Sequence, residues 1–198
     1  CAHDWDDVQL CWSPRLDEWF ASSIEGVSIA GDGAGIAGAE AAAQRGRIAA
    51  LGAALRLRRI DAAQAAQQVA GPRFELDAAS RGRRFLDLLY RPAPQFRVPT
   101  AATIVCRCEE VTAAQIVDAV KLGCTGPNQL KSFLRCGMGP CQGRLCGLTV
   151  TELIAATRGV RPEAVGYYRL RPPVKPITLA ELAAMPKSDA DVTAVVRG

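Results

Sequence analysis

Two pairs of cysteines place the strongest constraint on what this chain can fold into. Cys106 and Cys108 form a C-x-C pair, Cys141 and Cys146 form a C-x4-C pair, and the 32 residues 109–140 separate the two pairs. Two pairs of thiolates supply the four ligands that a [2Fe–2S] cluster or an all-thiolate zinc site requires. Structural zinc usually takes C-x2-C pairs, so the C-x-C spacing favours iron–sulfur. We therefore expect a small domain built around a metal centre.

The number of cysteines, the first residues and the single histidine limit which kinds of cysteine site and which cellular location we expect. The chain has eight cysteines in 198 residues, and its first ten residues, CAHDWDDVQL, have neither the basic nor the apolar region of a secretory signal. We therefore expect a cytoplasmic location and metal-bound thiolates, because disulfide frameworks belong mainly to short secreted domains. His3 is the only histidine, which excludes Rieske ligation, histidine-rich zinc sites and most histidine-based catalytic triads.

Charge and hydropathy exclude two classes of partner. The net charge is only +4, and the arginines are scattered without interleaved aromatic residues, so we expect no nucleic-acid binding. No apolar run approaches the ~18 residues that would span a bilayer, so we expect no membrane span.

The chain divides into four regions by pattern. Residues 1–90 begin as loop and strand, with "GVSIAG" as a strand over 26–31, and continue as alanine-rich helices. Residues 91–103, "RPAPQFRVPTAAT", carry three prolines and are typical of a linker. Residues 104–159 hold the cysteine pairs, and residues 160–198 form a proline-rich extended tail with a terminal helix. We expect a helix-rich α+β chain whose cysteine region is all-α.

Local signals predict where the helices begin and end. Asp61 is expected to cap a second helix, and a third is expected over 75–90. In the cysteine region, Thr112 and Gln115 form a capping box, Pro127 starts the next helix, and another covers 144–157. A further capping box, Thr178 with Glu181, predicts the helix of the tail.

The surroundings of the cysteines suit an anionic cluster. Each pair lies just before a predicted helix N-terminus, where free N–H groups and the helix dipole favour negative charge. Three glycines, Gly137, Gly139 and Gly143, permit close approach of the backbone to the sulfurs. Three arginines, Arg107, Arg135 and Arg144, either add positive charge or are simply solvated.

The segment "IVCRCEEVTAAQIVDAVKLGCTGPNQLKSFLRCGMGPCQGRLC" resembles the [2Fe–2S] domain of bacterioferritin-associated ferredoxin. It is more similar to the version in the large flavoprotein subunits of opine oxidases, hydroxyproline and proline dehydrogenases and hydrogen cyanide synthase, because the ferredoxin closes with a shorter C-x2-C. The resemblance implies that Cys106, Cys108, Cys141 and Cys146 are the four ligands.

Four cysteines remain outside this set. Cys124 and Cys136 are expected to be small buried hydrophobic residues, with Cys136 the first choice if one ligand is misassigned. Cys1 and Cys11 belong to the first region and are expected to bind nothing.

The glycines of "SIAGDGAGIAGAEAA" are spaced as G-x-G-x-x-G, but the context argues against an NAD site. A Rossmann unit needs a second strand and an acidic residue about 20 residues on, whereas residues 52–60 continue as helix. The segment instead resembles the late flavin-binding motif of two-dinucleotide-domain flavoproteins. That resemblance implies that Gly31, Asp32 and Gly33 contact FAD, with Asp32 near its ribityl–phosphate part. A glycine-rich turn without a ligand is the alternative.

These resemblances imply the C-terminal part of an FAD-binding subunit, either a fragment or one piece of a split enzyme. FAD would then require an N-terminal FAD-binding half from a longer chain or a partner. We find no candidate acid–base group for catalysis, so we expect substrate chemistry in a partner subunit with its own flavin and electron relay here. The alternatives are a stand-alone ferredoxin-like carrier and a redox-inert, zinc-stapled interaction module.

Overall fold

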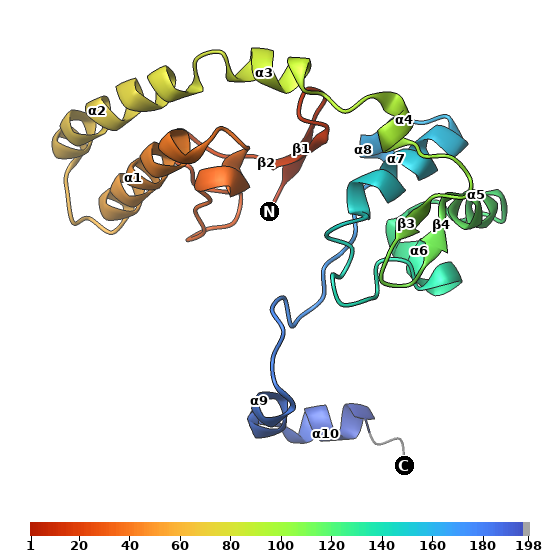
Figure 1. Cartoon of the computed structure of the whole chain (residues 1–198). Coiled ribbons are helices and arrows are strands. Elements are labelled where there is room, and N and C mark those ends of the chain that lie inside the picture. Colours follow the sequence, from red (N-terminus) through yellow and green to blue (C-terminus); the bar gives the residue numbers. More distant parts are fainter. Residues whose placement is uncertain (196–198) are drawn as a thin grey trace. The chain divides into compact units, whose positions relative to one another are not determined.

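The computed structural model describes residues 1–195, which form two compact units, residues 1–167 and residues 168–198 as far as they are described. The chain is helix-rich with two small sheets, as expected for an α+β chain (Figure 1). The expected remnant of a two-dinucleotide-domain FAD-binding fold in residues 1–90 is not confirmed, because the strands described there form a two-stranded antiparallel hairpin. None of the described helices has the length and apolarity needed to cross a membrane.

The first sheet is an N-terminal hairpin. Strand β1 (His3–Asp6) pairs with strand β2 (Cys11–Pro14) in antiparallel register, which places Trp5 opposite Trp12. The two indole rings pack edge to face with centroids 5.7 Å apart, an arrangement that aromatic rings favour. The expected strand over 26–31 is wrong: this part makes only an isolated bridge, Ala21 with Ser28.

A helical hairpin follows the glycine segment. A short 3-10 helix, η1 (Gly31–Ala34), leads into α1 (Ala39–Arg56), which packs beside α2 (Ala62–Ser80) (Figure 1). Asp61 caps α2 through a capping box with Gln64, as predicted. The third helix is shorter than predicted: α2 continues through residue 80, and α3 (Arg83–Leu89) begins only after Gly82 turns the chain with a left-handed backbone.

The segment predicted as a linker contains a short helix, α4 (Pro94–Arg97), that contacts α7 (Gly147–Arg158). Arg97 forms an ion pair with Glu152 of α7, whose side chain is only 7% exposed. Burial raises the pKa of Glu152 above its ordinary value of 4.5, and the charge of Arg97 opposes this without cancelling it. The linker is thus attached to the cysteine region by a buried charge pair.

The cysteine region packs around one central helix, α7, which contacts α4, α5 (Ala113–Lys121), α6 (Pro127–Leu134) and α8 (Pro162–Val165). The predicted capping box of Thr112 with Gln115 is present, and Pro127 begins α6 as expected. The core consists of fully buried apolar side chains from three helices: Ile116, Leu130, Val150 and Ile154.

Two expectations for this region need correction. It is not all-α, because β3 (Ile104–Cys106) and β4 (Val111–Thr112) pair in an antiparallel hairpin. The last helix begins at Gly147 instead of residue 144, because residues 141–146 are turns. These turns contain Cys141 and Cys146.

The second unit begins at Tyr168. It contains α9 (Leu179–Ala184), which Thr178 caps together with Glu181 as predicted, and α10 (Asp189–Val195).

Candidate metal centre

Five of the eight cysteine thiols gather between the β3–β4 hairpin and the start of α7. Cys106 ends β3, Cys136 follows α6, and Cys146 is the residue before α7; their three Sγ atoms all lie within 4.8 Å of one another. All three residues are buried. The Cys146 thiol contacts those of both Cys136 and Cys106, and the Cys136 thiol together with burial raises its pKa.

Cys108 and Cys141 form a second thiol pair beside the first group. Their thiols are in hydrogen-bonding contact with each other. Both residues are half-buried, in contrast to the fully buried Cys106 and Cys146. The structure therefore brings together the four cysteines predicted as ligands, as two contacting pairs, Cys106 with Cys146 and Cys108 with Cys141.

The backbone around Cys141 is arranged to hold negative charge. Its thiol accepts hydrogen bonds from the N–H groups of Leu145, Gly143 and Arg144, and these donors lower its pKa. Such a cradle of successive backbone N–H groups is a recurrent way to stabilise anionic sulfur. The backbone of residues 143–145 thus lies close to the Cys141 sulfur, as the nearby glycines predicted.

Gly139 makes the close approach of the two loops possible. A Cβ atom added at Gly139 would lie 2.2 Å from Cys108 Cβ and 3.3 Å from Cys108 Sγ. No side chain fits there, so the loop can reach Cys108 only with glycine at this position. Of the three nearby arginines, Arg135 pairs with Glu109 at 3.1 Å and Arg144 donates to the Cys141 carbonyl oxygen at 3.3 Å.

The other cysteines lie apart from this group. Cys124 is buried, and its Sγ contacts the Gly126 carbonyl oxygen at 3.5 Å; burial raises the pKa of its thiol. Cys1 is exposed beside His3, and Cys11 lies in β2. Cys136, expected as a buried hydrophobic residue but also as the first choice if one ligand is misassigned, is buried and belongs to the thiol group.

The predicted flavin residues lie on a turn. Gly31, Asp32 and Gly33 all belong to η1, and the Arg45 guanidinium of α1 binds the carbonyl oxygens of Gly31 and Gly35. Burial lowers the pKa of Arg45, and the negative charge of Asp32 opposes this. Helix α1 begins at Ala39, several residues beyond Asp32.

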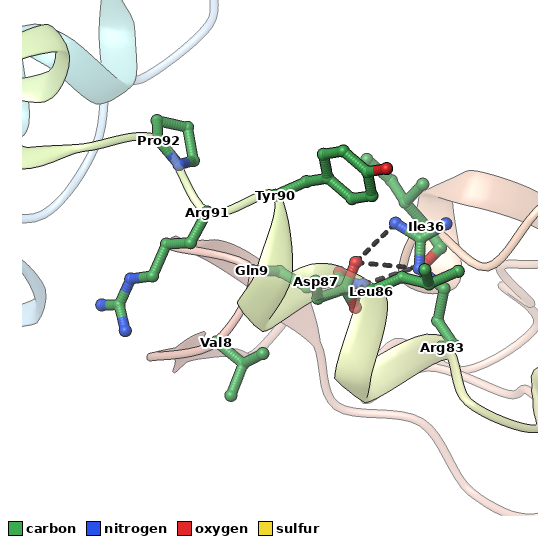
Figure 2. Close-up of a pocket in the computed structure, with 9 residues that line it drawn as sticks. All are labelled: Val8, Gln9, Ile36, Arg83, Leu86, Asp87, Tyr90, Arg91 and Pro92. Carbon is green, nitrogen blue, oxygen red and sulfur yellow. Dashed lines mark hydrogen bonds and ion pairs between the residues drawn. The ribbon is translucent and has the colours of Figure 1, made fainter.

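A pocket of about 330 Å³ lies next to this turn and is lined by residues from the first hairpin, the segment after η1 and α3 (Figure 2). Gln9 donates to the Ile36 carbonyl oxygen at 2.8 Å and to Asp87 at 2.9 Å, and Arg83 pairs with Asp87 (Figure 2). These bonds join three segments that are distant in sequence.

Residues 100–186 match the sarcosine oxidase A3 domain family. The chain is 49% identical to the A subunit of opine oxidase from Rhizobium meliloti, over 98% of its own length and 37% of that protein's. The corresponding protein of Agrobacterium tumefaciens is 48% identical, with 98% and 39% covered. Nearly the whole of this chain is thus similar to a part of the opine oxidase A subunits.

The resemblance drawn from the cysteine segment is therefore confirmed. Hydrogen cyanide synthase subunit HcnB of Pseudomonas aeruginosa is 38% identical over 80% of this chain and 34% of its own length. The chain thus spans less than two fifths of these relatives. No solved structure matches it.

Proposed function

We propose that this chain is the electron-transfer portion, in the C-terminal part of the larger subunit, of a flavin-dependent oxidoreductase that acts on C–N bonds of amino acids, imino acids or opines. The observation that carries the proposal is the pairing of Cys106 with Cys146 and of Cys108 with Cys141. A [2Fe–2S] cluster needs two thiolates on each iron, and tetrahedral coordination puts such a pair about 3.8 Å apart. Contacting thiol pairs suit that requirement.

Cys106 and Cys146 would hold one iron, and Cys108 and Cys141 the other. When bound, the cluster would accept and release single electrons. The N–H groups of Leu145, Gly143 and Arg144 would stabilise the thiolate of Cys141, and Gly139 would leave room for Cys108. The half-buried Cys108–Cys141 pair would form the side closer to solvent, whereas Cys106 and Cys146 would keep the other iron dry.

FAD would be shared with residues outside this chain. Gly31, Asp32 and Gly33 would contribute one turn of the flavin site, and the remaining dinucleotide fold would come from an N-terminal FAD-binding half. A partner subunit with its own flavin would oxidise the substrate. We place the complex in the cytoplasm and assign it no nucleic-acid partner. Asp32→Ala should then lower the FAD content of the complete enzyme without changing its iron content. An unchanged FAD content would show that Asp32 does not contribute to the flavin site.

Metal analysis of anaerobically purified chain tests the relay. We expect brown protein with two iron and two labile sulfide per chain and a reversible one-electron EPR signal. Iron–sulfur protein that binds no flavin, even with its candidate partner subunits present, would instead favour a stand-alone ferredoxin-like carrier.

A zinc-stapled interaction module is the second candidate, and one observation favours it. Cys106, Cys136 and Cys146 form a compact buried group of three thiols, and three or four thiolates suffice for structural zinc. Colourless protein that contains one zinc and no sulfide would establish this function and overturn the relay.

A further inference from the structure

The ring of Tyr167 lies directly on the start of α7, beside the thiol group. A Cβ atom added at Gly147 would lie 2.2 Å from the Tyr167 hydroxyl oxygen, 2.4 Å from Cζ and 2.6 Å from Cε2. Gly147 is the residue after Cys146, so the ring occupies the space that any side chain at this position would need. The Tyr167 hydroxyl also donates to the Gly143 carbonyl oxygen at 3.4 Å.

The surroundings of Tyr167 place it close to two of the thiols. Burial raises the pKa of its hydroxyl, and the nearby Cys146 and Cys141 side chains raise it further. Tyr167 therefore lies over the turn that runs from Cys141 to Cys146, the same turn whose N–H groups point at Cys141.

Two further bonds hold the backbone of this tyrosine in place. The buried hydroxyl of Thr151, one turn along α7 from Gly147, donates to the Gly166 carbonyl oxygen at 2.9 Å. The amide of Asn128 in α6 donates to the Tyr167 carbonyl oxygen at 3.0 Å. Residues 166 and 167 are thus attached to both α6 and α7. The Tyr167 ring can move off Gly147 only if these hydrogen bonds break or the tyrosine side chain rotates.

We propose that Tyr167 is a positioning residue that closes the thiol group beside Cys146, with its ring as a lid, and that residue 147 must be glycine to leave room for this ring. The closure slows the escape of the bound metal and the entry of water and chelators. It leaves the Cys108–Cys141 contact as the more open side of the group. The inference rests on metal binding in the proposed function but holds for iron–sulfur and for zinc.

The test measures the rate at which EDTA removes the metal from the chain as purified. Iron is followed by bleaching of the visible absorbance and zinc by a chromogenic chelator. Tyr167→Ala should accelerate release about tenfold, because the closed state is lost, whereas Tyr167→Phe should retain most of the protection because the ring remains. Wild-type release rates in Tyr167→Ala would overturn the proposal.

Gly147→Ala displaces the ring by a different route and leaves the tyrosine in the chain. Alanine favours helix more than glycine does, so a loosened site cannot be attributed to a weaker α7. We expect release as fast as in Tyr167→Ala, with no further acceleration in the double variant, since both changes remove one interaction. Release from the double variant that is faster than from either single variant would contradict the proposal that both changes remove the same ring contact. Gly46→Ala, on α1 with nothing within 4 Å of the added Cβ, is the matched control.

Alkylation separates an open lid from a partly unfolded domain. During metal release in iodoacetamide, mass spectrometry should find Cys146 modified faster in Tyr167→Ala than in wild type. Cys124 is buried in the same region with its Sγ against the Gly126 carbonyl oxygen and should keep its wild-type rate. Equal acceleration at Cys124 would show general unfolding and overturn the lid. The metal content decides between the proposed functions separately, because the release assay works with either metal.

Discussion

The thiols of Cys108 and Cys141 touch although 32 residues separate them in the chain. The hairpin of β3 and β4 carries Cys108, the turn before α7 carries Cys141, and Gly139 lets the two approach. The half-buried state of both residues contrasts with the buried Cys106 and Cys146. The group thus has a buried side and a side closer to solvent.

The proposed ligand set predicts the outcome of single serine substitutions. Cys108→Ser or Cys141→Ser should abolish the cluster, whereas Cys124→Ser should leave it intact because its thiol contacts a backbone carbonyl instead. Absorbance, EPR and iron–sulfide analysis provide the measurement. Cys136→Ser is the sharpest discriminator, since this thiol contacts Cys146: bleaching on loss of Cys136 but not of Cys146 would show that the ligand set is wrong.

A methyl group at position 139 should disturb the metal centre. Gly139→Ala places a Cβ atom 2.2 Å from Cys108 Cβ, so the loop or Cys108 must move. Substitutions that disturb ligand orientation typically cost about 10–100-fold in metal affinity, and we expect a loss of that size. Competition with a calibrated chelator measures it. Gly71→Ala, whose Cβ meets nothing within 4 Å, should show wild-type affinity, and full retention in Gly139→Ala would contradict the close approach of the two loops.

Loss of Arg97 should destabilise the cysteine region. Arg97→Ala leaves the buried carboxylate of Glu152 without its partner, and an unsatisfied buried polar group costs about 1–3 kcal/mol. Urea unfolding measures the change in the free energy of unfolding. In the Glu152→Gln background the same arginine substitution should cost less, because no charge remains to be compensated; an equal cost in both backgrounds would show that the ion pair contributes nothing.

Glu152 should also produce a pH dependence of stability. Its pKa is raised in the folded chain, mainly by burial, so the folded state binds the proton more tightly than the unfolded state. Its contribution to the free energy of unfolding is therefore fully present below the ordinary value of 4.5 and is lost as the pH rises through the folded pKa. Unfolding of Glu152→Gln across this range should lack that decline, and parallel curves for the two proteins would refute the assignment.

Local sequence signals determined much of the helical structure. The capping boxes of Asp61, Thr112 and Thr178 begin α2, α5 and α9 where predicted, because a cap bonds groups within one turn. Gly82 interrupts the expected helix over 75–90 by a left-handed turn that periodicity did not reveal. The strand expected over 26–31 lacks a full partner strand, and a strand depends on pairing that local sequence does not encode.

The spacing of Cys106, Cys108, Cys141 and Cys146 in the chain is enough to indicate a thiolate site without knowledge of the fold. The packing of the folded chain sets how these cysteines pair, and it brings Cys136 against Cys146 and Tyr167 onto Gly147. The spacing of cysteines along the chain indicates which thiols could bind a metal together. Contacts between distant segments depend instead on how α6, α7 and the β3–β4 hairpin pack. Those contacts arise from the burial of a shared core, a property that no short motif contains.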